Sequence, residues 1–345
     1  MRIGYVATMR AFIVGGAGFI GSHLADKLVE QGPVTLYDNL SIGKTAFVAG
    51  HLSSGAATLV EKDALDLPAL TEAMAGHDVV FHLAANPEAR WGLERTRLDL
   101  EQGTIATYNV LEAMRLSGVG QLVFASSGTV YGDTAEPCGE NDLGHLPVSL
   151  YGASKLAGES MVSAFAECFG IKALIFRFGN VVGSRGTHGA ALDFLKKLRD
   201  SRTYLEVLGD GRQAKPYLQV TDCVAGMLHG LRHAGSSAQT TPGGTLRDPS
   251  EFEKALRAAR DRVHIFNLAP PDFTSVRRIA ELCVAASPYP KAEIRYTGGE
   301  RGWPGDVPQS RLKPDKLAAL GFRVHYTSDQ AVEMAVRSLV KEVFG

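Results

Sequence analysis

Cysteine is scarce in this sequence of 345 residues, and the cysteines that occur are widely separated. Cys138, Cys168, Cys223 and Cys283 form no closely spaced pair of the kind that binds zinc, and four scattered thiols do not suit the disulfide framework of a small secreted domain. We therefore expect reduced thiols, no metal site and a cytoplasmic protein.

Net charge and long apolar runs are also lacking. Lysine and arginine together number 36 against 37 acidic residues, so no overall field favours nucleic acid or an anionic membrane. No run of 18 apolar residues occurs, and Met1 to Met9 are too short and too weakly apolar for a secretory signal. Residues 1–8 precede the first expected strand and are either a ragged end or an upstream start.

Short β-branched and apolar runs alternate with amphipathic stretches through the first half of the chain. This alternation is typical of right-handed crossovers in a doubly wound parallel sheet, the Rossmann-type α/β fold. The expected strands are Ala11–Val14, Val34–Tyr37, Thr58–Glu61, Val79–Leu83, Gln121–Ala125, Ala173–Arg177 and, late in the chain, Val263–Leu268.

The rhythm changes at about residue 184, where glycine-rich turns precede an expected helix at Ala190–Arg199 and a strand at Leu205–Leu208. We expect residues 9–183, 214–234 and 263–270 to form the dinucleotide domain. A smaller C-terminal substrate lobe would comprise 184–213 and 271–345. Residues 235–262 combine linker composition with a charged helical run and are interpreted as an inserted flexible excursion.

A glycine-rich turn follows the first expected strand, from Gly15 to Gly21 (GGAGFIG), and a helical pattern begins directly after it. Glycines at a strand-to-helix turn let backbone N–H groups approach a pyrophosphate, and the helix N-terminus adds partial positive charge. Alone, the motif is also compatible with a plain tight turn.

Asp38 ends the second strand 23 positions after Gly15, where an acidic residue binds the adenosine ribose hydroxyls and repels a 2′-phosphate. This spacing favours NAD over NADP, although Asp38 also suits a simple turn. Asp63 after the third strand either meets the adenine or caps the next turn. Ala84 and Ala85 after the fourth strand are small enough for close approach of a cofactor.

Tyr151 and Lys155 are four residues apart and share one face of an expected helix. An ammonium there can lower the phenol pKa, which would make Tyr151 a general base for a sugar hydroxyl. The same spacing also occurs in solvated surface pairs. Ser126 and Ser127 end the fifth strand at the carboxyl edge of the sheet, and Ser127 is the candidate to share the proton with Tyr151, with a capping turn as the alternative.

With these residues placed, the chain resembles the extended short-chain dehydrogenase/reductases that act on nucleotide sugars, especially UDP-sugar 4-epimerases. The likeness spans nearly the whole length. It rests on GGAGFIGSHL from Gly15, YDNLS from Tyr37, HLAA from His82, SSGTVYG from Ser126, YGASK from Tyr151, RFGN from Arg177 and LGDGRQ from Leu208.

The resemblance implies catalysis by Ser127, Tyr151 and Lys155, and NAD as a tightly held cofactor that is regenerated in each turnover. The implied cofactor-binding residues are Gly15, Gly18, Phe19, Ile20, Gly21, Asp38, Asn39, Leu40, Ser41, Gly43, Lys44, Asp63, Ala64, Leu83, Ala84, Ala85, Ser126, Tyr151, Lys155 and Phe178. The implied substrate-binding residues are Asn86, Arg90, Ser127, Gly128, Thr129, Tyr151, Asn180, Arg185, Thr187, Arg212, Lys215, Tyr217, Arg301 and Asp306.

The implied reaction moves a hydride from sugar carbon 4 to NAD and returns it to the other face of the 4-keto sugar. Relatives that dehydrate or decarboxylate the sugar carry a carboxylate in the segment that aligns with Ser127–Thr129, because elimination needs an acid and a base. This segment has none, which ranks epimerase above dehydratase, decarboxylase or 4-ketoreductase. A non-catalytic NAD-binding module is the alternative of another class.

The resemblance also suggests which UDP-sugar is the substrate. Arg185 resembles an arginine that clamps the carboxylate in uronic-acid 4-epimerases, which would select UDP-glucuronate over UDP-glucose, although a diphosphate contact or a surface ion pair is also compatible. Lys215 replaces the family's usual arginine, Arg301 stands two positions further from Asp306 than in many relatives, and Leu100 replaces an asparagine that contacts the cofactor. The helices around 101–116 and 151–168 pair subunits in relatives, which implies a homodimer.

Overall fold

The central sheet has seven parallel strands in the order β11-β6-β5-β4-β1-β2-β3. The structure, a computed structural model, describes residues 8–134, 136–142, 145–234 and 262–345. The strands are β1 (Ala11–Val14), β2 (Val34–Asp38), β3 (Ala57–Glu61), β4 (Val79–His82), β5 (Gln121–Ser127), β6 (Lys172–Phe178) and β11 (Val263–Leu268). All seven predicted strands are confirmed, and the Rossmann-type order reverses between β1 and β4.

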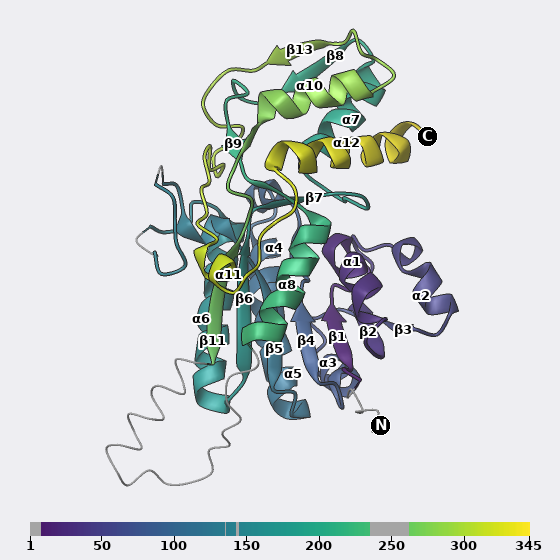
Figure 1. Cartoon of the computed structure of the whole chain (residues 1–345), viewed down its shortest axis with the longest axis vertical. Coiled ribbons are helices and arrows are strands. Elements are labelled where there is room, and N and C mark those ends of the chain that lie inside the picture. The colour runs from purple at the N-terminus through teal and green to yellow at the C-terminus, as the bar shows by residue number, and fades with distance from the viewer. Residues whose placement is uncertain (1–7, 135, 143–144, 235–261) are drawn as a thin grey trace.

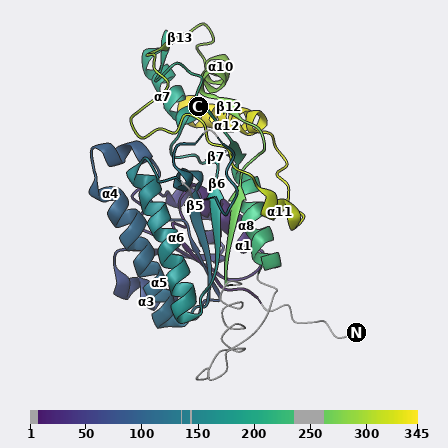
Figure 2. The ribbon, with the colours of Figure 1, turned by 90° about the vertical axis from the view of Figure 1, so that its left-hand side faces the viewer.

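Helices cover both faces of this sheet, which is why its central strands are apolar along their length. Figure 2 shows α3 (Leu67–Met74), α5 (Ala106–Ser117) and α6 (Leu150–Phe169) on one face. On the other face lie α1 (Phe19–Leu28) and α8 (Val220–Ala234). Two buried clusters correspond to these two layers, so the chain forms a sandwich with the sheet at its centre.

A smaller lobe lies at one end of the sheet (Figure 1) and has its own apolar core. It is built from α7 (Ala190–Ser201), α10 (Val276–Ala286) and α12 (Ser328–Phe344) packed against the parallel strands β8 (Tyr204–Val207) and β13 (Glu293–Tyr296). Segments far apart in sequence thus converge, and each helix is amphipathic because only one of its faces meets this core.

Two short strand pairs connect the lobe to the sheet. They are β7 (Asn180–Val182) with β10 (Tyr217–Gln219), which are parallel, and β9 (Ala214–Lys215) with β12 (Thr274–Ser275), which are antiparallel. The proposed division into domains stays a prediction. One helix of the proposed lobe, however, packs against the central sheet instead. The helix α11 (Asp315–Ala319), expected in the lobe, contacts β11, and its Leu317 is buried in the core beneath the sheet.

The remaining elements are short and lie in the connections. They are η1 (Thr45–Phe47), α2 (Ala49–Ser53), η2 (Ala89–Leu93), α4 (Arg97–Asp99), the π-helical turn η3 (Leu100–Ile105) and η4 (Gly128–Tyr131). Across the described part of the chain, no helix is both long enough and apolar enough to cross a membrane. The excursion predicted at 235–262 lies outside the described residues except for Arg262.

Candidate functional site

The turn between β1 and α1 has no room for side chains at its glycines. Gly15 has φ +83°, and a Cβ on it would lie 2.8 Å from the backbone nitrogen of Ala84. A Cβ on Gly21 would overlap the carbonyl oxygen of Gly15. Gly18 is the N-cap of α1, so the open end of that helix faces the pocket. This close backbone packing at a helix N-terminus fits a pyrophosphate.

Asp38 ends β2 beside this turn with its carboxylate held in place. It accepts hydrogen bonds from the backbone nitrogens of Ala17 and Leu40, both at 2.9 Å. Burial raises the pKa of Asp38, while these backbone donors favour its charged form. A Cβ on Gly43 would lie 2.8 Å from the Asp38 carboxylate, so the glycine keeps this acceptor accessible. The arrangement suits the ribose hydroxyls of NAD.

One continuous cavity of about 420 Å³ runs from the glycine turn to the lobe. Most of the predicted site residues line it. Those on the cofactor side are Gly15, Gly18, Phe19, Ile20, Gly21, Asp38, Asn39, Ser41, Gly43, Ala64, Leu83, Ala84, Ala85, Ser126 and Phe178. Those at the chemical end and on the lobe side are Asn86, Ser127, Gly128, Thr129, Tyr151, Lys155, Asn180, Thr187, Lys215, Tyr217 and Asp306.

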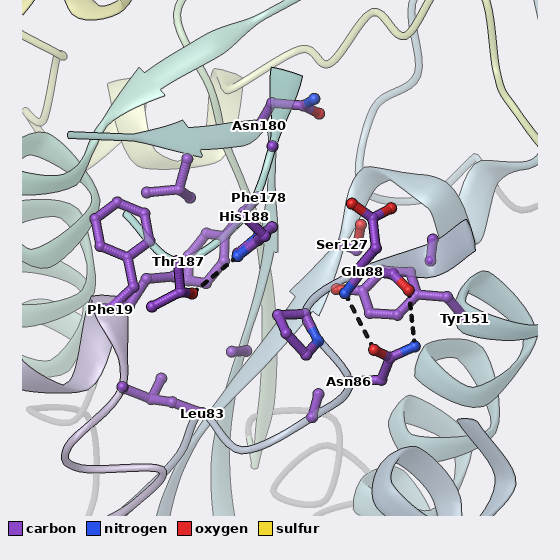
Figure 3. Close-up of a pocket in the computed structure, with 18 of the residues that line it drawn as sticks. Phe19, Leu83, Asn86, Glu88, Ser127, Tyr151, Phe178, Asn180, Thr187 and His188 are labelled. Atoms are coloured by element: carbon purple, nitrogen blue, oxygen red, sulfur yellow. Dashed lines mark hydrogen bonds between the residues drawn. The ribbon is translucent and has the colours of Figure 1, made fainter. Parts of the chain in front are cut away.

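Ser127 and Tyr151 meet inside this cavity (Figure 3) and share a hydrogen bond. The Ser127 oxygen accepts from the hydroxyl of Thr129 at 3.0 Å and from its backbone nitrogen at 3.2 Å. With its acceptor positions used in this way, the Ser127 hydroxyl is directed to donate to Tyr151. The short helix η4 begins at Gly128 because Ser127 caps it, so one turn places both hydroxyls.

Burial governs the acidity of this group. It raises the pKa of Tyr151 to about 12, the bond from Ser127 opposes that shift, and the charge of Asp99 adds to it. The lowered phenol pKa expected from the spacing of Tyr151 and Lys155 is therefore not found, because desolvation is the largest influence on the phenol. Lys155 is 4% exposed, and burial lowers its pKa to about 8 while Asp99 and Glu159 oppose the change. Its ammonium donates to the carbonyl of Ala125 at 2.7 Å. Lys155 is thus held one helical turn from Tyr151 with its charge inside the protein.

A buried network joins the strand ends that carry these residues. Arg177 on β6 pairs with Glu159 on α6 at 2.6 Å, and its guanidinium also donates to the hydroxyl of Tyr131 at 2.8 Å. Ser126 donates to the same Glu159 carboxylate. Tyr131 in turn donates to Asn267 on β11 at 2.8 Å. The network fixes β5 relative to α6, and therefore Ser127 relative to Tyr151.

The lobe contributes the opposite wall of the cavity. Lys215 and Asp306 form an ion pair at 2.6 Å, which closes the 301–306 loop onto β9. Asn180 and Tyr217 share a hydrogen bond, and burial raises the pKa of Tyr217. The hydroxyl of Thr187 lies 3.2 Å from Nδ1 of His188, as Figure 3 shows. These groups offer polar contacts at the end where the sugar diphosphate is expected.

Several predicted residues are not brought into the cavity, although each lies near it in sequence. Leu40, Lys44, Asp63, Arg90, Arg185, Arg212 and Arg301 are absent from its lining. The Asp63 carboxylate instead accepts from the side-chain nitrogen of Asn39 at 2.7 Å and from the backbone of Leu65. Arg301 pairs with Asp133 at 2.5 Å and donates to the carbonyl of Asp306 at 3.1 Å. The side chain of Arg212 is 85% exposed.

Arg185 is the most informative of these. It adopts φ +59°, and its guanidinium lies 3.0 Å from the carboxylate of Asp26 on α1. Its backbone nitrogen donates to Glu342 on α12 at 3.2 Å. The interpretation of Arg185 as a clamp for a sugar carboxylate is therefore not supported by this geometry. The ion-pair alternative describes its placement, because the side chain links the lobe to α1.

The structure also brings in residues that sequence reasoning missed. Glu88, Gln102, Ser149, His188 and Trp303 line the cavity. His188 lines the cavity with exposed surface, and desolvation lowers its pKa while the charge of Glu88 opposes the change. Only Glu88 had a usable sequence signal, because it follows the predicted Asn86 by two positions, beyond the carboxyl end of β4. Gln102 was not recognisable, because it depends on the π-helical turn η3.

Leu100, at the position of the family's cofactor-contacting asparagine, is exposed and does not line the cavity. Its neighbour Asp99 is buried instead, accepts from Asn86 at 3.0 Å, and leaves its other carboxylate oxygen without a hydrogen-bond partner. No group of three or more metal-ligating side chains occurs among the described residues. The chemistry that the pocket offers is proton transfer by Ser127 and Tyr151.

Comparisons with known proteins agree with this geometry. A putative UDP-glucose 4-epimerase of Methanocaldococcus jannaschii is 34% identical over 228 residues, which cover 64% of this chain and 72% of that protein. The crystal structure of a UDP-galactose 4-epimerase superposes with a TM-score of 0.81 at 36% identity, covering 97% of this chain and all of that one.

A UDP-glucose 4-epimerase of Thermus thermophilus, solved in complex with NAD, superposes with a TM-score of 0.77 at 26% identity, covering 96% of this chain and 99% of that one. The sequence profile of the NAD-dependent epimerase/dehydratase family matches residues 11–241. The protein described here is thus an NAD-dependent enzyme, and it belongs to the NAD-dependent epimerase/dehydratase family of extended short-chain dehydrogenase/reductases.

Proposed function

We propose that this enzyme interconverts the two configurations at carbon 4 of a UDP-linked sugar. The observation that carries the proposal is the hydrogen bond between Ser127 and Tyr151 inside the pocket, one helical turn from buried Lys155. The glycine turn from Gly15 to Gly21 and the Asp38 carboxylate would hold NAD, which would supply hydride chemistry at carbon 4. The residues of the chain handle the proton of the 4-hydroxyl.

The proton step follows from the direction of the hydrogen bonds. Thr129 donates to Ser127, so Ser127 donates to Tyr151 and favours the phenolate form against the burial that raises the phenol pKa. The phenolate would be favoured further by the positive charge of bound NAD. Tyr151 can then take the proton from a sugar hydroxyl and give it back after the hydride returns. The same groups serve both directions of an epimerisation, which needs no further acid or base.

One carboxylate does lie near the place where elimination chemistry would occur. Residues 127–129 lack a carboxylate, but Glu88 enters the same cavity. Burial alone would raise the pKa of Glu88, yet its hydrogen bonds and ion pair with Arg90 outweigh burial and leave that pKa lowered. An ionised, doubly held carboxylate is a poor proton donor, so epimerisation remains favoured over dehydration or decarboxylation.

The test is to incubate the purified enzyme separately with UDP-glucose, UDP-glucuronate and UDP-N-acetylglucosamine and to resolve the products by NMR. We expect a 4-epimer without added cofactor and without net absorbance change at the reduced-nicotinamide band. Tyr151→Phe should lower kcat by at least roughly a hundredfold while NAD remains bound. Tyr204→Phe, on an exposed lobe strand, is the matched control.

Other products would redirect the proposal within the family. A 4-keto-6-deoxy sugar would indicate a dehydratase, carbon dioxide release from UDP-glucuronate a decarboxylase, and stoichiometric cofactor consumption a ketoreductase. No conversion of any UDP-sugar by protein that still binds NAD would favour a non-catalytic module. Near-normal turnover in Tyr151→Phe would remove the proposed base.

We also propose a homodimer, because the helices that pair subunits in relatives present apolar side chains on their outer surface. The outer surface of η3, α5 and α6 exposes large apolar side chains, among them Leu100, Ile105, Tyr108, Leu116 and Phe169. Figure 2 shows α5 and α6 side by side on that face. Light scattering of the purified enzyme should give twice the chain mass of 36.9 kDa, and Tyr108→Glu should shift the species toward the monomer.

A further inference from the structure

Glu88 places a carboxylate in the sugar compartment that the proton-transfer step does not use. It precedes η2 and caps that short helix by accepting from the backbone nitrogen of Arg90 at 3.3 Å. Figure 3 shows its carboxylate directed away from Asn86, on the side of the cavity where Ser127 and Tyr151 lie.

Hydrogen bonds hold both the backbone and the carboxylate of Glu88. Asn86, which is buried, accepts from the Glu88 backbone nitrogen at 3.1 Å and donates to its carbonyl at 3.0 Å. Asn86 is itself anchored by Asp99. The carboxylate of Glu88 is gripped by Arg90 through two further bonds of 3.0 Å, and its side chain is 17% exposed. A surface glutamate has no such support, so this one is preorganised.

The hydrogen bonds from Arg90 leave one acceptor position of the Glu88 carboxylate unused. A carboxylate has about four lone-pair positions. Oε1 accepts from Nε and the backbone nitrogen of Arg90, whereas Oε2 accepts only from the guanidinium. Oε2 can therefore accept a further hydrogen bond from a donor in the cavity. A sugar hydroxyl is such a donor, and a bond to a charged acceptor is stronger than one between neutral groups.

Within the part of the chain that the structure describes, a sugar carboxylate would find no arginine or lysine beside Glu88 that is not already paired with Asp or Glu. Arg90 is held by Glu88, and Lys215 is paired with Asp306. Arg185 is paired with Asp26 outside the cavity. Burial lowers the pKa of His188, which favours its neutral form at neutral pH, while the charge of Glu88 opposes this change. A second carboxylate placed beside Glu88 would therefore be repelled without compensation.

We propose that Glu88 determines substrate specificity, by accepting a hydrogen bond from a hydroxyl of a neutral sugar and excluding sugars that carry a carboxylate. This inference rests on the proposed 4-epimerase function and narrows its substrate class. Asn86 and Arg90 are the positioning residues of Glu88. Arg90 thus acts on the substrate only through the carboxylate that it holds.

The experiment compares kcat/KM for UDP-glucose and UDP-glucuronate in the wild type, Glu88→Gln and Glu88→Asp. The wild type should prefer UDP-glucose by roughly tenfold or more. Glu88→Gln removes the charge and frees Arg90, so it should lose at least about tenfold of this preference, with a raised KM for UDP-glucose. Glu88→Asp keeps the charge and should still discriminate against UDP-glucuronate.

Glu293→Gln is the matched control, because Glu293 pairs with Arg295 at the same spacing of two residues on an exposed strand of the lobe. NAD content and melting temperature of each Glu88 variant should equal those of this control, so that a folding defect is separated from a change of specificity. The control should keep the wild-type preference for UDP-glucose.

The outcomes separate this inference from the proposed function. Equal use of both substrates by the wild type, or an unchanged preference in Glu88→Gln, would overturn the role of Glu88 while leaving epimerisation intact. If the wild type converts no UDP-sugar, the proposed function fails. Calorimetric binding of UDP-glucose and UDP-glucuronate then measures the same preference, and its absence would overturn the role of Glu88 as well.

Discussion

Removing the charge of Glu159 should destabilise the enzyme more than any surface change of the same kind. Arg177 is 0% exposed and Glu159 5%, and their side chains are joined at 2.6 Å and 2.9 Å. Glu159→Gln leaves a buried guanidinium without its counter-charge, which costs about 3–5 kcal/mol. Because the free energy of unfolding of a domain is typically about 5–15 kcal/mol, this is a large fraction of the total.

The assay is thermal and urea unfolding with bound NAD controlled. The expected decrease in melting temperature is roughly 4–8 °C. Glu333→Gln is the control, because it removes the same charge from an exposed pair with Arg337 and should cost less than about 1 kcal/mol. Adding Arg177→Gln to Glu159→Gln should cost less than the sum of the two single changes, since the orphaned charge is gone. A Glu159→Gln enzyme that melts with the wild type would refute this reasoning.

Two further predictions concern the affinity for NAD and the melting temperature at acidic pH. Asp38→Asn should weaken retention of NAD by roughly tenfold or more, because the charged acceptor for the ribose hydroxyls is lost; fluorescence titration of the stripped protein measures this, and unchanged affinity would contradict it. Burial lowers the pKa of His82 to about 3, with Lys155 adding to the shift. Because the unfolded chain binds a proton at His82 near pH 6.5 and the folded protein does not, the folded state loses stability as the pH falls from about 6.5 toward 3. The melting temperature between pH 7 and pH 4 should therefore decline less steeply in His82→Gln than in the wild type.

Much of the fold could be predicted because its signals are local. The apolar runs of β1 and β4 and the glycine turn from Gly15 to Gly21 each specify an element without reference to distant residues. The spacing of Tyr151 and Lys155 works in the same way, since a helix places them one above the other wherever that helix lies. The ends of the seven strands of the central sheet differ from the predicted ends by two residues at most.

The misses have a different cause, because they depend on how segments pack. Leu317 gives no local sign that α11 leaves the lobe to cover β11. Gln102 reaches the pocket only through the wider π-helical turn η3, which no hydrophobic period reveals. Glu88 could have been noticed beside Asn86, but its importance depends on Arg90 and on the wall opposite, which the sequence does not place.

Arg185 shows why side-chain roles carry over less reliably than backbone roles. At φ +59° its backbone is in the left-handed region, and Asp26 on α1 supplies a counter-charge outside the cavity. Asp26 also contacts His51 at 2.7 Å, so the arginine joins a cluster that links α1, α2 and the lobe. Turning the Arg185 side chain into the pocket would break the ion pair with Asp26. The ion pair of Arg185 with Asp26 and that of Glu88 with Arg90 therefore both support the proposed preference for a neutral sugar, although they are separate contacts.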